Sequence, residues 1–301
     1  MKRKEYHQQH IESLAYDGHG VAKPEGMALF VEDALPDEIV DVRVTRKKKQ
    51  HAFGRVTEFH RLAPYRIQPF CEHFDHCGGC KWQYLPYEKQ LEFKQDFVHQ
   101  AFSRFAGVDL QEAGIMEPIL ECPRERRFRN KLEFSFSNKA FKVDGNEGGD
   151  LGAVGFHVRG LFDKVIDIHE CHLQDEPSNA IRNRVREICE AGGYDFYDIR
   201  EKSGFFRTLI VRSNMAGEFL LVFNFGRDEA DWREDIFSTL LREFPQIIGI
   251  HYVINLSGND DIRGHVIHHA HGDHYLSEEC GATRVHIRPT SFYQTNSFQA
   301  P

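Results

Sequence analysis

Four cysteines place the strongest constraint on how this chain can fold. Cys71, Cys77 and Cys80 follow the spacing C-x5-C-x2-C, and Cys171 lies far downstream. A buried structural cysteine has no reason to recur at loop distances, and a pair of glycines between two of the thiols lets the backbone fold tightly around a compact group. Soft thiolate ligands suit Zn²⁺ or an iron–sulfur cluster. The spacing therefore predicts a metal site.

The identity of the metal stays open at this point. Histidines flank the cysteines, so a mixed Cys/His zinc site is one alternative; they are His73, His76, His169 and His172. Thiols without a metal are the remaining alternative. A disulfide is disfavoured because the chain shows no secretory context.

Composition sets the compartment but not the partner. The chain has 301 residues, of which 41% are hydrophobic and 28% charged, as in a globular protein of about two domains. No apolar stretch follows the first residues, so we expect no signal peptide, and no run approaches the length of a membrane span. These features predict a cytoplasmic protein with no membrane association, and no obligate protein partner is inferred. The net charge of -8 does not exclude nucleic-acid binding, which needs only local positive charge.

Residues 1–60 are predicted to form a small β-barrel. Short β-rich runs at Ala28–Val31, Ile39–Val44 and Gly54–Phe59 are separated by turn signals. Between the second and third runs lies a cationic segment that contains Arg46, Lys47 and Lys48. It is either a solvated hairpin tip or a grip on phosphates, as barrels of the oligonucleotide-binding kind hold RNA with loops and one sheet face.

Two further segments carry clear periodic patterns. Residues 86–108 are predicted to form a helix with a broad aromatic face, which is usually a core face. The segment from Pro123 to Phe136 is predicted to be a strand. Phe128 and the apolar residues after it would face a core, while Arg127, Arg129 and Lys131 would form a cationic stripe on the other face. That stripe is either solvated or an RNA contact.

The remainder is predicted to be α+β. Helices are expected between Pro177 and Gly192 and at Asp231–Phe244. Strands are expected at Thr208–Arg212, Phe219–Phe225 and Ile247–Leu256, the first two joined in a hairpin. The remaining cysteines lack ligand spacing and are interpreted as small hydrophobic residues; they are Cys122, Cys189 and Cys280.

Together these segments resemble the RNA uracil-C5 methyltransferase family of the 23S ribosomal RNA type. The stretch CEHFDHCGGCKWQYLPYEKQLEFK is similar to the family's cluster motif, with Cys171 as the distant ligand. Residues 1–60 resemble the TRAM domain, an RNA-binding β-barrel. Phe-Arg-Asn-Lys at 128–131 and Ser-Phe-Tyr-Gln-Thr-Asn at 291–296 resemble motifs before and at the start of the family's methyltransferase domain.

The resemblance implies a cofactor set and a division of the chain. Cys71, Cys77, Cys80 and Cys171 would hold a [4Fe–4S] cluster, and Gln294 would contact S-adenosylmethionine. Residues 61–290 would form a central α+β domain with a cluster loop at 71–80 and a helix at 86–108 that packs on the catalytic domain. Residues 291–301 would begin the methyltransferase domain, whose Rossmann-like body would be largely missing. The tail at 291–301 would therefore be loosely held, and the aromatic face of the helix would be partly uncovered.

The resemblance also implies a reaction on RNA, in which the methyl group passes to C5 of a uridine through a covalent adduct of a cysteine with C6. No catalytic residue is assigned within the 301 residues, and the chain by itself is expected to be inactive. The target base must be flipped from its stack. Arg46, Lys47, Lys48 and the cationic stripe would hold ribosomal RNA, and Phe292 would lie near the flipped uracil. The alternative is a non-catalytic iron–sulfur or zinc protein that binds RNA.

Overall fold

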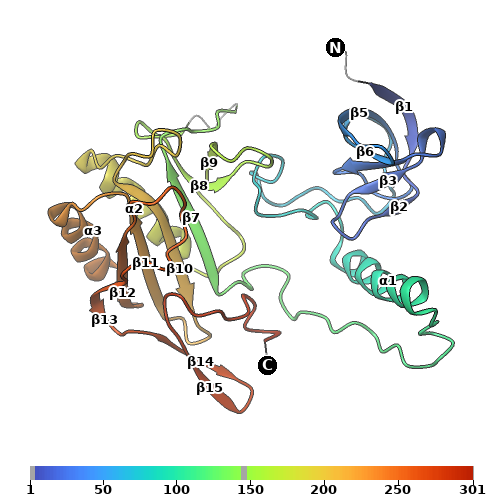
Figure 1. Ribbon diagram of the computed structural model, residues 1–301. Helices are drawn as coiled ribbons and strands as arrows, with labels where there is room; N and C mark the ends of the chain where they lie inside the picture. The colour runs from blue at the N-terminus through green and yellow to red at the C-terminus, as the bar shows by residue number, and fades with distance from the viewer. Residues whose placement is uncertain (1–3, 144–147, 301) are drawn as a thin grey trace. The chain divides into compact units, whose positions relative to one another are not determined.

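The computed structural model describes residues 4–143 and 148–300, which form two compact units. The first unit comprises residues up to Phe74 together with Cys80–Glu121, and the second comprises Asp75–Gly79 together with residues from Cys122 onward. Each unit has its own sheet (Figure 1). The predictions for residues 1–3 and for Pro301 lie outside the described residues.

The first unit is built on a six-stranded sheet with the strand order β1-β5-β6-β4-β3-β2. Its strands are β1 (Glu5–His10), β2 (Ser13–Leu14), β3 (Gly20–Ala22), β4 (Ala28–Glu32), β5 (Ile39–Lys47) and β6 (His51–Arg61). A 3-10 turn, η1 (Pro24–Gly26), precedes β4. Alternate residues of β5, Val40, Val42 and Val44, are buried in one core. The period-2 pattern of the sequence therefore produced the predicted strands.

A single long helix completes the first unit. Helix α1 (Tyr87–Ala106) ends at Gly107, which adopts the left-handed conformation that ends many helices. Leu91 is buried, but Phe102 is 47% exposed and Phe105 is 84% exposed. The prediction that the whole aromatic face is a core face is therefore wrong, whereas the prediction that Phe102 and Phe105 are uncovered is confirmed.

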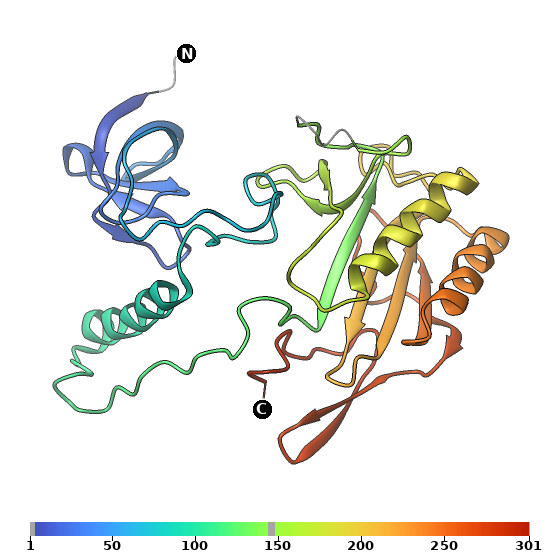
Figure 2. The same ribbon diagram turned by 180° about the vertical axis from the view of Figure 1, so that it is seen from behind.

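The second unit is built on a seven-stranded sheet with the order β13-β12-β11-β10-β7-β8-β9. Its strands are β7 (Lys131–Ser137), β8 (Ala153–His157), β9 (Val165–Asp167), β10 (Phe206–Ser213), β11 (Phe219–Phe225), β12 (Ile247–Ile254) and β13 (His268–Gly272). Helices α2 (Ser178–Gly192) and α3 (Ala230–Glu243) cover one face of it, as Figure 2 shows. The predicted helices and the hairpin of β10 and β11 are confirmed.

Alternation along the central strands gives this sheet a core on each face. Phe219, Leu221, Phe223 and Phe225 of β11 pack with the helices. Leu220 and Val222 point the other way and pack with β14 (Leu276–Cys280), β15 (Thr283–Ile287) and the segment before β13. Both faces of β11 are buried, which explains its continuous apolar sequence.

The α+β class expected from the sequence is wrong. Strands β11 and β12 run parallel, with α3 as the connection between them, so the sheet is mixed and contains a β-α-β unit. A parallel pair needs such a crossover connection. The sequence predicted β11, α3 and β12 as elements, but it did not indicate that β12 pairs with β11 in the parallel direction.

Candidate functional site

An aromatic cluster lies on the surface of the first sheet, where β4 and β6 pair in parallel. Phe30 and Phe53 are register partners, and their rings stack with centroids 5.3 Å apart. His51 packs edge-on against both rings, at 5.4 Å from Phe53 and 5.8 Å from Phe30. All three side chains are half-buried and so keep part of their surface open. We call Phe30, His51 and Phe53 the aromatic platform.

The predicted cationic segment lies beside this platform. The guanidinium carbon of Arg46 sits 4.3 Å from the centroid of the Phe53 ring. Lys47 ends β5, Lys48 follows it, and all three cations are exposed. No ion pair is found for any of them among residues 4–143 and 148–300. By contrast, Arg43 pairs with Glu5 and Arg55 pairs with Glu32 on the neighbouring strands, at 2.8 and 2.6 Å.

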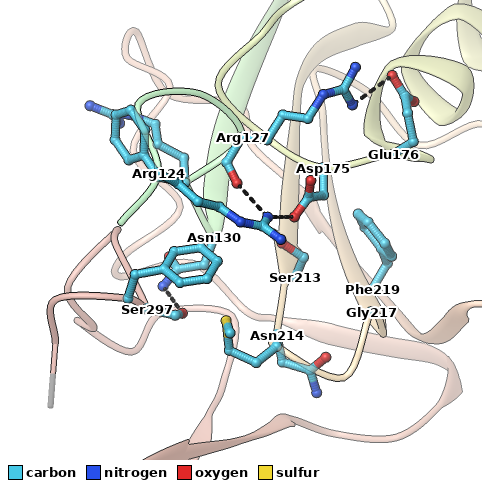
Figure 3. Close-up of a pocket in the computed structure, with 14 residues that line it drawn as sticks. Arg124, Arg127, Asn130, Asp175, Glu176, Ser213, Asn214, Gly217, Phe219 and Ser297 are labelled. Atoms are coloured by element: carbon cyan, nitrogen blue, oxygen red, sulfur yellow. Dashed lines mark hydrogen bonds and ion pairs between the residues drawn. The ribbon is translucent and has the colours of Figure 1, made fainter. Parts of the chain in front are cut away.

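A pocket in the second unit gathers the arginines of the predicted cationic stripe (Figure 3). Its space measures about 490 Å³, including the open solvent at its mouth, and its lining combines cations, carboxylates and three phenylalanines. The lining residues that carry the argument are Arg124, Arg127, Arg129, Asp175, Glu176 and Phe298. Positive charge therefore does face a pocket here, but it is accompanied by negative charge.

The pocket arginines are largely paired. Arg124 makes an ion pair with Asp175 at 2.8 Å and lies 4.6 Å from the Phe298 ring centroid. Arg127 lies 3.6 Å from a Glu176 oxygen and 3.7 Å from a Glu170 oxygen. The carboxylates come from the segment 170–176, which is distant in sequence. The cationic stripe is thus partly neutralised, which the local sequence did not indicate.

The predicted strand from Pro123 to Phe136 is wrong at its start. Strand β7 begins at Lys131, and Arg127 has a φ of 54°, so the alternation does not extend back to it. Instead, the backbone N–H groups of Arg127 and Arg129 donate to the carbonyls of His172 and Leu173, both at 2.8 Å. Arg127, Phe128 and Arg129 are all half-buried and line the pocket together.

From Lys131 onward the prediction for the apolar face is confirmed. Leu132, Phe134 and Phe136 are buried in the core beneath the helices. Lys131 is only half-exposed and stands in register with Arg212 of β10. Burial lowers the pKa of Lys131, and the neighbouring Arg212 lowers it further. This part of the sheet therefore concentrates positive charge in a partly desolvated place.

Residues 291–300 are anchored to this region, so the prediction that the tail is loosely held is wrong. The N–H of Asn130 donates to the Thr295 carbonyl at 2.9 Å, and Arg129 bridges to Asn296. The side-chain amide of Asn130 donates to the hydroxyl of Ser297, which in turn donates to a Glu278 oxygen at 2.9 Å. Asn130, Ser297 and Glu278 are all buried. A buried network of this kind costs free energy to break.

The anchored tail leaves the two predicted site residues accessible. Phe292 is 88% exposed. The side chain of Gln294 is exposed as well, while its backbone carbonyl accepts a hydrogen bond from the Asn130 amide at 2.8 Å. Their roles stay predictions.

The four predicted metal ligands divide between the two units. Cys77 and Cys171 belong to the second unit and are each 8% exposed in its main core. Cys71 and Cys80 belong to the first unit, where they are half-buried against the cluster that contains Phe74 and Tyr84. The prediction that all four thiols converge concerns both units and stays a prediction.

The surroundings of the buried pair suit a compact anionic group. The N–H of Gly79 lies 3.4 Å from Cys77 Sγ, and a Cβ on Gly78 would come within 2.7 Å of the His157 carbonyl oxygen. The backbone of Cys171 is held by Asn179, which also receives a hydrogen bond from the fully buried Arg182. Burial lowers the pKa of Arg182 to about 10, and Cys171 opposes that shift. A buried cation is therefore close enough to interact with this thiol.

One of the cysteines without ligand spacing is deeply buried and unreactive. Cys189 is fully buried on α2, and burial raises the pKa of its thiol. The prediction that Cys189 serves as a small hydrophobe is confirmed.

Comparison with known proteins identifies the first sheet. Residues 10–57 match the model of the TRAM domain. The match includes most of the six-stranded sheet and all three residues of the aromatic platform. No helix among the described residues is long and apolar enough to cross a membrane.

Curated relatives match nearly the whole chain. An uncharacterized RNA methyltransferase of Porphyromonas gingivalis is 40% identical over 300 residues, which is 96% of this chain and 64% of that protein. One from Bacteroides thetaiotaomicron is 39% identical over 296 residues, or 95% of this chain and 64% of that protein. The chain thus spans just under two thirds of the length of these relatives.

A solved structure shows the same fold. The tRNA (uracil-54, C5)-methyltransferase of Pyrococcus abyssi, crystallised with S-adenosyl-L-homocysteine, covers 97% of this chain with a TM-score of 0.68 and 24% identity. The alignment covers 62% of that chain. The expectation of a fold whose Rossmann-like domain is largely missing is wrong, because almost all of this chain matches the fold of a methyltransferase. The chain carries a TRAM domain, and it is similar over nearly its whole length to RNA methyltransferases.

Proposed function

We propose that this chain serves the methylation of uracil at C5 in RNA, with S-adenosylmethionine as methyl donor and 23S ribosomal RNA as substrate. The observation that carries the proposal is the 40% identity to an RNA methyltransferase over 300 residues. The TRAM match at residues 10–57 agrees with an RNA substrate. The choice of uracil C5 and of 23S RNA rests on the sequence motifs.

The surface of the TRAM domain supports the RNA-binding part of this proposal. Single-stranded RNA is held by aromatic side chains on which bases stack and by cations that contact phosphates. Phe30 and Phe53 offer a stacked aromatic surface, and Arg46, Lys47 and Lys48 offer cations with no carboxylate partner among the described residues. In this proposal the platform holds a base while the cations hold the backbone on either side.

The pocket of the second unit would take a second part of the RNA. Arg127, Arg129 and Lys131 hold the backbone here, with Phe128 beside them. Phe292 lies near the flipped uracil, where its exposed ring is free to stack on a base. The exposed Gln294 contacts the methyl donor, which supplies the methyl group when it is bound. These residues bind and orient, and none of them is assigned a chemical step.

We also propose that Cys71, Cys77, Cys80 and Cys171 ligate a [4Fe–4S] cluster. Two observations support the fit: the N–H of Gly79 is directed at the Cys77 sulfur, and the buried Arg182 donates to the same Asn179 oxygen as the Cys171 N–H. Hydrogen bonds and charges next to the sulfurs are what stabilises such clusters. Anaerobically purified protein should contain about four irons per chain, and Cys171→Ser should lose them. Zinc bound by these thiols in place of iron would overturn the cluster assignment.

Removing the gene tests the proposed reaction directly. A host strain that lacks the gene encoding this chain should lose 5-methyluridine from its 23S RNA, as measured by mass spectrometry of RNA nucleosides. Return of the gene should restore the modified base. A gene variant that carries Ala at 46, 47 and 48 should restore less, because its RNA binding is weakened.

The other outcomes separate the parts of the proposal. Loss of 5-methyluridine from transfer RNA with 23S RNA unchanged would overturn the substrate and keep the reaction. Unchanged 5-methyluridine in every RNA, together with RNA binding by the purified protein, would overturn the reaction and favour a non-catalytic RNA-binding protein.

A further inference from the structure

Three histidines converge at the β13 edge of the second sheet. Ring nitrogens of His251, His269 and His274 all lie within 4.8 Å of one another. The rings of His269 and His274 stack at 3.9 Å, and the ring of His251 lies 5.1 Å from that of His269. His251 is on β12, His269 is on β13, and His274 follows β13 on the way to β14. The cluster belongs to no site described so far.

The backbone brings these side chains together in two steps. His251 and His269 are register partners in the antiparallel pair of β12 and β13, at a point where the register skips Ala270. The chain then turns back at Gly272, which has a φ of 71°. A Cβ there would lie 1.9 Å from the Ile248 carbonyl oxygen, so the turn requires glycine. After it, the N–H of Asp273 donates to that same oxygen at 2.7 Å, which fixes His274 beside His269.

The cluster has the features of a ligand set and not of an ordinary exposed patch. His251 is only 4% exposed, and its Nδ1 has no hydrogen-bond partner among the described residues. A buried polar atom left without a partner is costly.

His269 is oriented in the way that metal-binding histidines are. Its Nε2 lies 2.8 Å from the carbonyl oxygen of Gly272. In the neutral ring, an N–H at Nε2 that donates to this oxygen makes Nδ1 the nitrogen with a lone pair for a cation. Ligating histidines usually donate their second ring nitrogen to a carbonyl or a carboxylate in this manner. The exposed side chains of His269 and His274 give an ion a path from solvent.

We propose that His251, His269 and His274 form a binding site for a divalent transition-metal ion, with Zn²⁺ as the expected occupant. Three imidazoles suit Zn²⁺, which binds histidine nitrogen and takes four ligands, and a water molecule completes the set. Mg²⁺ and Ca²⁺ prefer oxygen ligands, and the cluster contains no carboxylate. The bound ion joins the edge strand β13 to β12 and to the turn at 272–274.

Cobalt absorption tests the site, because Co²⁺ replaces Zn²⁺ and its spectrum reports the ligands. The chelator-treated protein should give visible Co²⁺ bands that remain when Cys71→Ser and Cys171→Ser remove two of the four predicted cluster ligands. His269→Gln and His274→Gln should each weaken Zn²⁺ binding at least tenfold, since even the loss of an outer hydrogen bond to a ligating histidine costs about 10- to 100-fold. Both side chains are exposed, so neither variant is expected to unfold the protein.

His271→Gln is the matched control. His271 is an exposed histidine of the same strand, but it stands opposite Ile250 and is outside the cluster. It should bind Zn²⁺ as the unaltered protein does, and Zn²⁺ should raise the melting temperature of both by the same amount. Affinity within twofold of the unaltered protein in His269→Gln and His274→Gln would overturn the proposal. Equal losses in all three single variants would overturn it too, because they would indicate unspecific binding along the histidine-rich strand.

Discussion

Both units present arginines and lysines to solvent, but the two groups of cations differ in whether carboxylates pair with them. On the first sheet Arg46, Lys47 and Lys48 have no carboxylate partner among the described residues, and Arg46 lies over an aromatic ring. In the second unit Arg124 and Arg127 are held by acidic side chains of the segment 170–176. Exposed ion pairs gain little free energy, but each one cancels part of the field that a phosphate would feel.

This difference shows that a count of cations is a poor guide to an RNA surface. The stripe around Arg127 looked as basic in sequence as the segment around Lys47. Only the stripe around Arg127 has part of its charge offset by carboxylates from a distant segment of the chain. We therefore expect the TRAM surface to supply most of the salt-dependent affinity and the pocket to supply orientation.

The largest expected effect comes from removal of the unpaired cations. Replacement of Arg46, Lys47 and Lys48 by Ala should weaken binding of single-stranded RNA by about 100-fold and reduce the slope of log affinity against log salt by about 2, because each lost phosphate contact removes about 0.7. Fluorescence anisotropy at several salt concentrations measures both. The control is Arg43→Ala with Arg55→Ala, which removes paired cations from the same sheet and should change the slope by much less. Equal slopes for the two variants would contradict the comparison.

The next effect concerns the aromatic platform. Phe53→Ala should weaken RNA binding by about tenfold, since stacking of a base on an aromatic ring contributes about 1–3 kcal/mol. Unlike the loss of cations, it should leave the salt slope unchanged. The control is Phe59→Ala, which removes an exposed ring of the same strand outside the platform. If both variants bind RNA equally well, the platform does not hold a base.

A smaller effect is expected from the paired arginine of the pocket. Arg127→Ala should lower RNA affinity by about threefold, because Glu170 and Glu176 already offset its charge. The salt slope should fall by less than it does for a single unpaired cation such as Lys47→Ala. A loss as large as that of the triple variant would show that the ion pairs open when RNA binds and that the pocket is the main binding surface.

The smallest effect, and the sharpest test of pairing, is a gain. Glu170→Gln removes one of the two carboxylates near Arg127 and should raise RNA affinity by about twofold. Glu279→Gln is the matched control, because it removes the same charge from an exposed pair with Arg284 on the hairpin of β14 and β15. Equal gains in the two variants would mean that net charge alone, and not the pairing of Arg127, governs the change.

The sequence predicted the elements well where burial follows a period. Strands β4, β5 and β6 of the first sheet, the hairpin of β10 and β11 and both helices of the second unit follow from regular apolar spacing. Their arrangement was harder to predict, because the parallel pairing of β11 and β12 depends on where α3 packs and leaves no local signal. The stripe at 127–131 was predicted as a strand because nothing in the local pattern shows that Arg127 takes a positive φ.

The site residues show the same limit. Arg46, Lys47 and Lys48 are neighbours in sequence and were easy to identify. The platform was missed because Phe30 and Phe53 meet only when β4 pairs with β6. The histidine cluster did leave a signal, since the segment 268–274 contains four histidines, but its buried member, His251, is contributed by another strand.

The hydrogen bonds of Asn130 have a consequence for the order in which the protein folds during synthesis. Every strand of the first sheet finds its partners between residues 5 and 61, so that sheet is complete early. The side-chain amide of Asn130 instead donates to the Gln294 carbonyl, which is synthesised 164 residues later. Contacts of such long range form slowly, and they form last on a growing chain. The TRAM surface is therefore ready to meet RNA while the second unit is still incomplete on the ribosome.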